Sequence, residues 1–292
     1  MMNNNILGME ERAEKLNALL LAQEADFTID YVRVWKNNVE LEGYTLKSTV
    51  NNCAPTIYYH ADWYNQEDNK VVSYLMEMNK RHACQIEVSD LTDRAYILSH
   101  IYPRIVSAEN VKQLEERGIS HIKFLDMYVL FYVTVSDFMD EEGVASMQVT
   151  DALLRSAGIT IDEAYSKSLE NLEKEVEVKS MQEVLFGELG MECEFGEMQI
   201  PIWVCTTKNR IQGAATMLCS SMLRSLEEKI GGKVAILPSS IHECLALPYD
   251  TEEELKSFVS MVTEVNDTQV LPEEKLTDSV YYVEDGELKL AS

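Results

Sequence analysis

The sequence predicts a mixed α/β fold of the α+β class, arranged as two lobes that are each a sheet covered by helices. The first reason is size, because 292 residues with 46% hydrophobic positions can bury one large core or two ordinary ones. The second is periodicity, because segments with helical spacing alternate with short runs of β-branched and aromatic residues. The third is a change near residue 150, where a strand-rich part gives way to successive helices. We therefore expect an N-terminal lobe over residues 1–150 and a C-terminal lobe over residues 151–292.

The N-terminal lobe is predicted to begin with a helix and a hairpin. Apolar residues between 9 and 22 recur at the spacing of one helical face, which predicts an amphipathic helix packed on a sheet. Two runs of strand-forming residues, 31–35 and 41–46, flank Lys36-Asn37-Asn38. Because asparagine tolerates the positive φ of a tight turn, the pattern predicts a hairpin.

Further strands and helices complete the predicted N-terminal lobe. A strand over 55–59 is followed by helical spacing over 67–84, and a short helix over 110–117 ends at a glycine. The run 128–135 consists of apolar or β-branched residues only, which is typical of a central strand buried on both faces. Acidic residues and glycine gather at 137–143 without a hydrophobic period, and we interpret this stretch as a loop.

The C-terminal lobe is predicted to open with helices and to continue as a sheet. Apolar residues recur at i, i+3 and i+4 through 213–230, so this helix packs on the sheet, and Gly231-Gly232 stops it. The last strands form a hairpin that turns at Asp285-Gly286. The predicted helices cover 150–156, 162–172, 180–186, 213–230 and 252–265, and the predicted strands cover 202–205, 234–237, 243–247, 280–283 and 288–290.

The charge of the chain restricts its partners. Acidic residues outnumber basic ones by 50 to 25, which gives a net charge of −25. Nucleic acids and anionic membranes would meet long-range repulsion, so we expect neither as a partner. The acids concentrate in 162–197 and 252–287. Such faces usually only keep a protein in solution; the alternatives are mimicry of a nucleic acid or docking on a basic protein, for which the candidate residues are Glu170, Glu173, Glu252, Glu253 and Glu254.

The location of the protein is predicted from segments that the sequence lacks. It has no apolar run of about 18 residues, and its first residues lack the basic and apolar regions of a secretion signal, so we expect a cytoplasmic protein. The cysteines include no CxxC pair, and buried reduced thiols are favoured over disulfides or zinc ligands. They are Cys53, Cys84, Cys193, Cys205, Cys219 and Cys244.

One segment could carry catalysis. Ser239, Ser240, His242 and Glu243 offer hydroxyl, imidazole and carboxylate groups, the set needed for nucleophilic or acid–base work. Neighbouring residues on an extended chain point to opposite faces, and serines after a proline suit a turn in which their hydroxyls bond to backbone amides. A structural turn is therefore favoured over a catalytic site, and this segment is still the best catalytic candidate in the chain.

A second candidate is aromatic. Tyr59, His60, Asp62 and Trp63 lie together, and a histidine near an aspartate could bind a metal while exposed tyrosine and tryptophan could form a binding hot spot. Packing of the first lobe explains the same residues equally well. No metal-ligand motif occurs, so we predict no metal site and no cofactor. Gly213-Ala214-Ala215 lacks the lysine of a phosphate loop and is interpreted as close packing.

Six stretches are characteristic in combination: Lys36-Asn37-Asn38, Pro55-Thr56-Ile57-Tyr58, Phe124-Leu125-Asp126-Met127, Leu237 to Glu243, Glu264-Val265-Asn266 and Leu276-Thr277-Asp278-Ser279-Val280-Tyr281. Together they resemble a family of uncharacterised bacterial proteins with a domain of unknown function, common in anaerobic gram-positive bacteria and their mobile elements. The chain departs from the family pattern at Val39-Glu40, where the family often has a glycine, and this affects only the type of turn. The resemblance implies a shared fold, and it does not assign any catalytic activity.

The sequence favours a non-catalytic interaction or regulatory protein. Its acidic helices would dock on a basic surface of a protein partner, for example a host defence or nucleic-acid-handling factor, as the mobile-element resemblance suggests. A toxin-immunity or regulatory scaffold shares this chemistry and differs only in its partner. The alternative is a hydrolase in which His242 acts as acid or base, with Glu243 or Asp62 nearby and a serine or metal assisting.

Overall fold

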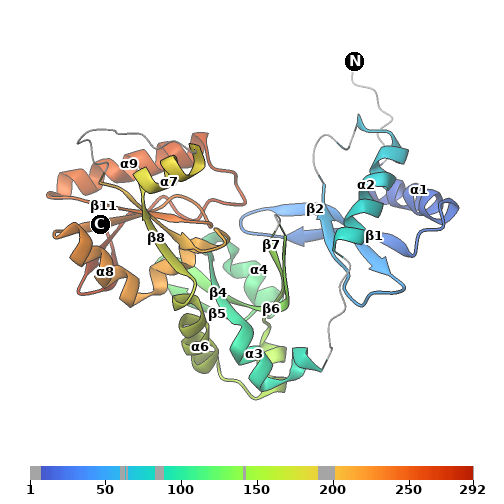
Figure 1. Ribbon diagram of the computed structural model, residues 1–292, viewed down its shortest axis with the longest axis horizontal. Coiled ribbons are helices and arrows are strands. Elements are labelled where there is room, and N and C mark those ends of the chain that lie inside the picture. The colour runs from blue at the N-terminus through green and yellow to red at the C-terminus, as the bar shows by residue number, and fades with distance from the viewer. Residues whose placement is uncertain are drawn as a thin grey trace. The chain divides into compact units, whose positions relative to one another are not determined.

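The computed structural model describes residues 8–59, 63, 65–82, 89–140, 143–189 and 201–291, and it confirms a mixed α+β fold (Figure 1). The chain divides into two compact units, Met1–Val88 and Ser89–Ser292. This boundary differs from the one predicted near residue 150.

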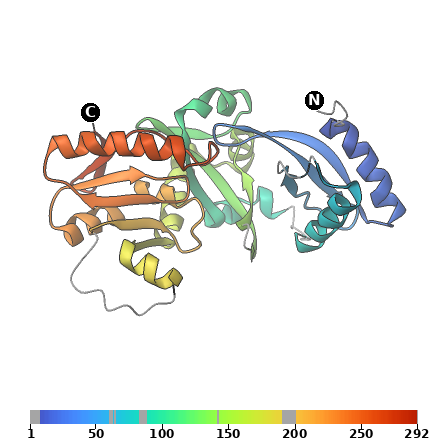
Figure 2. The same cartoon turned by 90° about the horizontal axis from the view of Figure 1, so that it is seen from above.

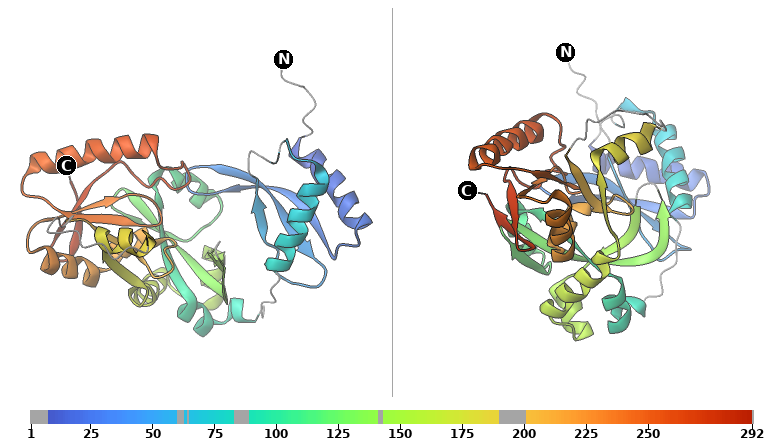
Figure 3. Two further views of the ribbon diagram at one scale, coloured as in Figure 1. Left: turned by 45° about the horizontal axis from the view of Figure 1, so that its top comes forward. Right: turned by 60° about the vertical axis from the view of Figure 1, so that its left-hand side comes forward.

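The first unit is an antiparallel sheet of three strands with both of its described helices on one face (Figure 3). Leucines, isoleucines and aromatic residues of the strands alternate toward these helices and are buried, as the amphipathic pattern predicted. The turn of the predicted hairpin has Asn38 at φ 62, which confirms the role expected of the asparagines. The elements are α1 (Met9–Ala22), β1 (Phe27–Trp35), β2 (Glu40–Ser48), β3 (Thr56–Tyr58) and α2 (Asp68–Arg81).

The second unit begins with an antiparallel sheet in which β6 is central. The strand order is β4-β6-β5. β5 pairs with the first part of β6, and β7 pairs with the part of β6 that follows. The elements are η2 (Asp90–Thr92), α3 (Arg94–His100), β4 (Ile101–Ser107), η3 (Ala108–Asn110), α4 (Val111–Glu116), β5 (His121–Phe124), β6 (Met127–Asp140) and β7 (Gly143–Gln148). The loop predicted at 137–143 is largely wrong, because β6 extends to Asp140 and β7 begins at Gly143. After an irregularity that follows Thr134, the two strands pair again at Met139 and Asp140, so the stretch continues as a strand without a hydrophobic alternation.

A larger antiparallel sheet completes the second unit. Its strand order is β13-β12-β10-β11-β9-β8. Its strands are β8 (Val176–Ser180), β9 (Trp203–Thr207), β10 (Val234–Pro238), β11 (Cys244–Pro248), β12 (Tyr281–Glu284) and β13 (Glu287–Leu290). The accompanying helices are α5 (Asp151–Ala157), α6 (Ile161–Glu173), α7 (Met181–Leu189), η4 (Gly213–Leu218), α8 (Ser220–Ile230) and α9 (Glu252–Thr268). The predicted helix over 213–230 is therefore two elements, because the backbone at Cys219 is extended.

Side chains on the two faces of this sheet enter different cores. On β10, Val234 and Ile236 pack with α8, η4, α6 and the smaller sheet, whereas Ala235 and Leu237 pack under α9. Figure 2 shows α9 lying along its face of the sheet. The larger core contains β4 and β6 residues together with residues of β9 to β12, so residues before and after 150 fold into one body. This shared core is why no boundary occurs at 150.

Candidate functional site

Two loops of the second unit meet beside β10 and β11. The loop 238–243, called the His242 loop below, contacts the segment 271–281 that follows α9. The Ile241 amide donates to the Glu274 carbonyl at 2.9 Å, and His242 Nε2 lies 3.7 Å from Glu274 Oε1. The His242 and Glu274 side chains are 37% and 34% exposed, so the pair is open to solvent.

His242 is positioned by backbone on its other side. The Gln212 amide donates to His242 Nδ1 at 3.4 Å, which leaves Nε2 to carry the proton of the neutral ring toward Glu274. Gln212 itself has φ 56, and Arg210 has φ 58, so the 208–213 turn contains two non-glycine residues in the left-handed region. The arrangement can hold a proton on an exposed imidazole beside a carboxylate.

The hydroxyl groups of the candidate serines form hydrogen bonds inside the turn. Ser240 Oγ accepts from the His242 amide at 3.0 Å, while Ser239 Oγ donates to the Glu243 carbonyl at 3.4 Å and to Glu243 Oε1 at 3.3 Å. Within this fully described loop no hydrogen bond joins a serine hydroxyl to the His242 ring. The structure therefore favours the predicted structural turn, and it does not assemble a serine nucleophile with its base.

Gly213 explains the small residues that follow the turn. A Cβ at this position would lie 2.1 Å from Thr206 Oγ1 and 2.3 Å from the His242 carbonyl. The Ala214 amide donates to the Ile241 carbonyl at 3.2 Å, so it is occupied within the fold. The interpretation of Gly213-Ala214-Ala215 as close packing is confirmed.

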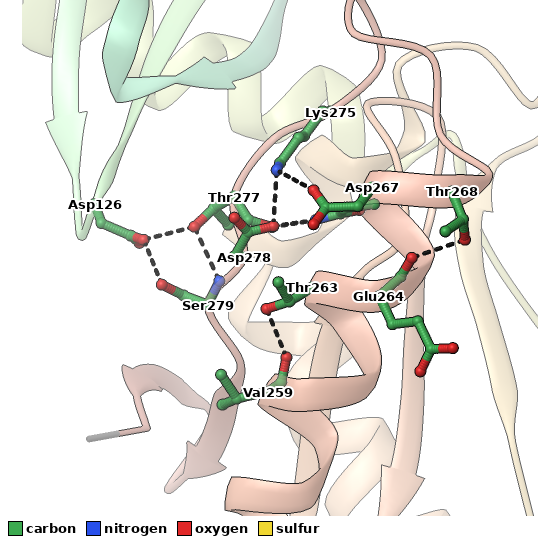
Figure 4. Close-up of polar contacts among 11 residues, drawn as sticks. Asp126, Val259, Thr263, Glu264, Asp267, Thr268, Lys275, Thr277, Asp278 and Ser279 are labelled. Atoms are coloured by element: carbon green, nitrogen blue, oxygen red, sulfur yellow. Dashed lines mark hydrogen bonds and ion pairs between the residues drawn. The ribbon is translucent and has the colours of Figure 1, made fainter.

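Asp126 anchors a second group of contacts that the sequence analysis did not single out (Figure 4). Its Oδ2 accepts from Thr277 Oγ1 and from Ser279 Oγ, each at 2.8 Å, as Figure 4 shows. Its Oδ1 accepts from the Tyr281 hydroxyl. We call these four residues the Asp126 cluster. Asp126 lies in the β5–β6 turn, where Leu125 has φ 53, so the cluster joins the smaller sheet to the start of β12.

Electrostatics in the Asp126 cluster follow from these contacts. Partial burial acts to raise the pKa of Asp126, but hydrogen bonds from Tyr281, Ser279 and Thr277 outweigh it and hold the pKa below its usual value. Burial, together with the bond to Asp126, raises the pKa of Tyr281 far above its usual value, so the phenol stays protonated and donates. Both carboxylate oxygens accept hydrogen bonds from within the protein. The cluster therefore holds two parts of the fold together and does not present a reactive group.

The contacts continue from the Asp126 cluster into α9. Asn266 Nδ2 donates to the Thr277 carbonyl at 3.0 Å and to Asp278 Oδ1 at 2.8 Å. Lys275 Nζ lies 3.0 Å from Asp278 Oδ1 and 3.6 Å from Asp267 Oδ1 (Figure 4). Asp126, Asn266 and 276–281 all belong to stretches that carried the family resemblance. The family resemblance of these stretches was the sequence signal that could have pointed to them. It gave no indication that the stretches contact one another in the fold.

The predicted docking acids lie in two places. Glu170 and Glu173 belong to α6, which packs in the larger core, whereas Glu252, Glu253 and Glu254 begin α9 on the other face of the sheet. Glu170 pairs with Lys167 at 2.6 Å, and Glu173 accepts from Ser221 Oγ at 3.0 Å. The structure therefore does not bring the two acidic regions together.

Glu254 has a structural use. Its amide donates to Thr251 Oγ1 at 3.3 Å and its carboxylate accepts from the Thr251 amide at 3.4 Å, which is a capping box. Glu252 and Glu253 are exposed in the same first turn, where negative charge suits the helix dipole. Of the predicted α9 acids, these two project to solvent and take no part in the capping box.

The aromatic candidates lie inside the first unit. Trp63 is only 6% exposed and packs edge-on against Tyr59, with ring centroids 5.2 Å apart. Arg12, also buried, donates to the Tyr59 hydroxyl at 2.9 Å and to the Trp63 carbonyl at 2.6 Å. This geometry supports packing over a binding hot spot. His60 and Asp62 lie outside the described residues.

The cysteines and possible metal ligands give a mixed result. Cys205, Cys219 and Cys244 are buried free thiols, as predicted, and burial raises the pKa of Cys219 to about 12. Cys53 is disulfide-bonded, so the expectation of a free thiol is wrong there. Across the described ranges, no three histidines, cysteines or acids are grouped to hold a metal ion. Within the same ranges, none of the helices combines the length and apolarity needed to cross a bilayer.

Comparisons with known proteins identify the family without assigning an activity. No curated protein matches the chain, and neither does any solved structure. The profile of a family of unknown function, DUF5688, matches residues 9–284 and therefore spans both units. The chain belongs to the DUF5688 family of unknown function.

Proposed function

We propose that the protein is a non-catalytic interaction module that docks on a basic protein through the outer surface of α9. The observation that carries this proposal is an acidic helix that leaves large apolar side chains in solvent. Met261 is 52% exposed and Val265 is 39% exposed, one helical turn apart, and exposed Glu264 lies beside them. Apolar side chains surrounded by charge are typical of the contact surface of a protein partner.

The charge of this surface defines the partner. Glu252 and Glu253 extend the acidic surface to the start of α9, and the whole chain carries −25. A second acidic protein would be repelled, whereas a partner with lysine and arginine around an apolar patch is attracted and oriented. Because Glu170 and Glu173 lie on α6, this proposal limits the docking surface to α9.

The test compares two charge reversals of equal size. In Glu252→Lys with Glu253→Lys, the acidic start of α9 becomes basic. In the control, Glu10→Lys with Glu11→Lys, the same change is made at two exposed residues in the first turn of α1. Glu254 is left intact because its reversal would also remove the capping box. Both pairs reverse the same charge within the first turn of a helix.

Tagged protein is used to capture partners from nuclease-treated lysate at low and high salt, and the affinity of each identified partner is then measured. We expect a basic protein whose binding weakens with salt and falls at least about tenfold in the α9 reversal but not in the α1 reversal. Replacing Met261 and Val265 by serine should also weaken the binding of this basic protein. Equal affinity of both reversals at all salt concentrations would sink the proposal.

We further propose that the module works in the cytoplasm as a regulatory protein, with a host defence or nucleic-acid-handling factor as the partner. The buried free thiols of Cys205, Cys219 and Cys244 support a reducing compartment, while the disulfide at Cys53 weighs against it. Trapping thiols in intact cells before lysis decides the matter. Free Cys53 in trapped protein supports the cytoplasm, and a fully oxidised Cys53 argues for another compartment.

A hydrolase centred on His242 is the second proposal, and the exposed His242–Glu274 pair supports it. Its weakness is that Ser239 and Ser240 are bonded within their own turn. A panel of ester, amide and phosphate substrates is compared for the native protein and His242→Ala. Turnover that is lost with the imidazole supports the hydrolase, and equal rates remove it.

A further inference from the structure

Arg104 occupies an unusual place on the smaller sheet of the second unit. Side chains alternate along β4, and Ile101 and Ile105 enter the larger core. Arg104 projects from the opposite face, where its cross-strand partner is Leu130. On that face Leu130 is buried, and Tyr102 and Tyr132 are uncharged and half-buried.

The guanidinium of Arg104 is held by neutral groups from two other strands. Its Cζ lies 3.6 Å from the centre of the Tyr132 ring on β6, and its Nη2 donates to Ser146 Oγ on β7 at 2.8 Å. The ring fixes the plane of the guanidinium and the serine fixes one edge. The group is therefore oriented before any ligand arrives.

Arg104 has no acidic partner. Whereas Arg12, Arg33 and Arg94 each pair with a carboxylate, no described carboxylate pairs with Arg104, although acids outnumber basic residues by 50 to 25. Burial lowers the pKa of Arg104, which shows that desolvation disfavours its charge. A leucine or methionine would cover Tyr132 without this penalty, so packing alone does not account for an arginine here.

We propose that Arg104, Tyr132 and Ser146 form a binding site for a carboxylate group. The N–H groups of Arg104 that Ser146 does not use form a planar fork that matches the two oxygens of a carboxylate. One guanidinium balances one negative charge, and its neighbours on this face of β4 and β6 are neutral. A phosphate dianion would require further cations, so a carboxylate fits better than a phosphate.

The carboxylate can come from a small molecule or from the end of a peptide. The probes are therefore sodium acetate, sodium benzoate, inorganic phosphate, and a short peptide with either a free or an amidated C-terminus. Each is titrated into the full-length, ¹⁵N-labelled protein at constant ionic strength, and the Arg104 Nε–H and Ser146 amide signals are followed by NMR. The site does not involve α9, so it is independent of the proposed docking function.

Two substitutions at Arg104 are compared with a matched control. Arg104→Lys keeps the charge and loses the fork, and Arg104→Gln loses both. Arg117→Gln removes a positive charge from an exposed arginine of the same unit. We expect a saturable shift with carboxylates in the native protein and in Arg117→Gln, and at least tenfold weaker binding in both Arg104 variants.

The native protein alone can overturn the proposal, so it does not depend on the variants folding. No saturable shift with any carboxylate probe would refute the site, and so would equal binding by Arg104→Gln. Phosphate binding as tight as carboxylate binding would refute the carboxylate assignment. A response to the free but not to the amidated peptide, stronger than that to acetate or benzoate, assigns the ligand to a peptide terminus; the reverse order assigns it to a small molecule.

Discussion

Gly213 lies where the backbone of the 208–213 turn approaches β9 and the His242 loop. A hypothetical Cβ would be 2.1 Å from Thr206 Oγ1 and 2.3 Å from the His242 carbonyl, and it would also be 2.7 Å from the Thr206 Cα. Two of these neighbours are backbone atoms, which cannot rotate away as a flexible side chain does. The position therefore requires glycine because there is no room for a Cβ atom, and not because of its backbone conformation.

Replacing Gly213 by alanine should destabilise the second unit by about 3 kcal/mol, because overpacking must displace the backbone. Gly232→Ala is the matched control, since nothing lies within 4 Å of its Cβ position. Its expected effect is small, about 0.5 kcal/mol in either direction. Urea unfolding followed by circular dichroism measures both. Similar midpoints for the two variants would show that the close approach at Gly213 is absent in solution.

Single residues also show what sequence alone could and could not reveal. The positive φ of Asn38 was predictable, because the residue type and the turn are local. Arg12 was missed because it lies in a helix whose polar positions looked solvent-exposed. In the structure it is 6% exposed, with bonds to residues more than 45 positions away, such as the carbonyl of Trp63. No local pattern encodes a partner at that separation.

At the scale of elements, the hydrogen bonds of the Asp126 cluster link the β5–β6 turn to the start of β12. The carboxylate of Asp126 accepts its three hydroxyl bonds only when it is ionised, and these bonds hold its pKa below the usual value despite burial. The folded protein therefore binds this proton less tightly than the unfolded chain does. Asp126 contributes stability at neutral pH, and this contribution is lost as the pH falls through the folded pKa.

Asp126→Asn should reduce the free energy of unfolding by about 1–2 kcal/mol at pH 7, because hydrogen bonds to a charged group are replaced by weaker ones. The difference between native protein and variant should begin to shrink below about pH 4, where the unfolded chain takes up the Asp126 proton before the folded protein does. Asp285→Asn, an aspartate in the exposed β12–β13 turn, is the control. Urea unfolding at several pH values measures the difference. A constant difference from pH 7 to pH 3 would contradict the assignment.

Elements with a strong local pattern were predicted well, and elements defined by pairing were not. The helix Met9–Ala22 was predicted with the bounds observed, because its buried residues recur on one face. The strands Ile101–Ser107 and Val176–Ser180 were missed. The first has a proline and an arginine in its middle, which hide its alternating burial in the sequence. The second, Val-Glu-Val-Lys-Ser, does alternate apolar and polar residues, but it is only five residues long and follows a strongly charged helix. Each is defined by its neighbours, β6 and β9.

At the scale of the whole molecule, the boundary between units depends on which strands share a core. The change from strands to successive helices near residue 150 predicts a boundary there. Residues before it, such as Phe131, and after it, such as Leu172 and Ile236, lie in the same buried cluster. A change in the type of element is therefore weaker evidence for a boundary than the sharing of a core.

Cutting the chain between Val88 and Ser89 should give two fragments that each fold, because each unit has its own hydrophobic core. Cutting between 150 and 151 should give fragments that do not fold, because each carries only part of the larger core. We expect the 89–292 fragment to unfold cooperatively in urea and to show dispersed amide signals by NMR. The first fragment, 1–88, should be the less stable of the two, since small domains bury a smaller share of their surface.

The Asp126 cluster supplies the matched comparison within this experiment. Asp126→Asn should destabilise the 89–292 fragment as much as it destabilises the intact chain, because every bond of the cluster lies within that unit. Cooperative folding of 151–292 alone would contradict the shared core. An unfolded 89–292 fragment would show instead that the second unit requires the first, and the two would then have to be treated as one domain.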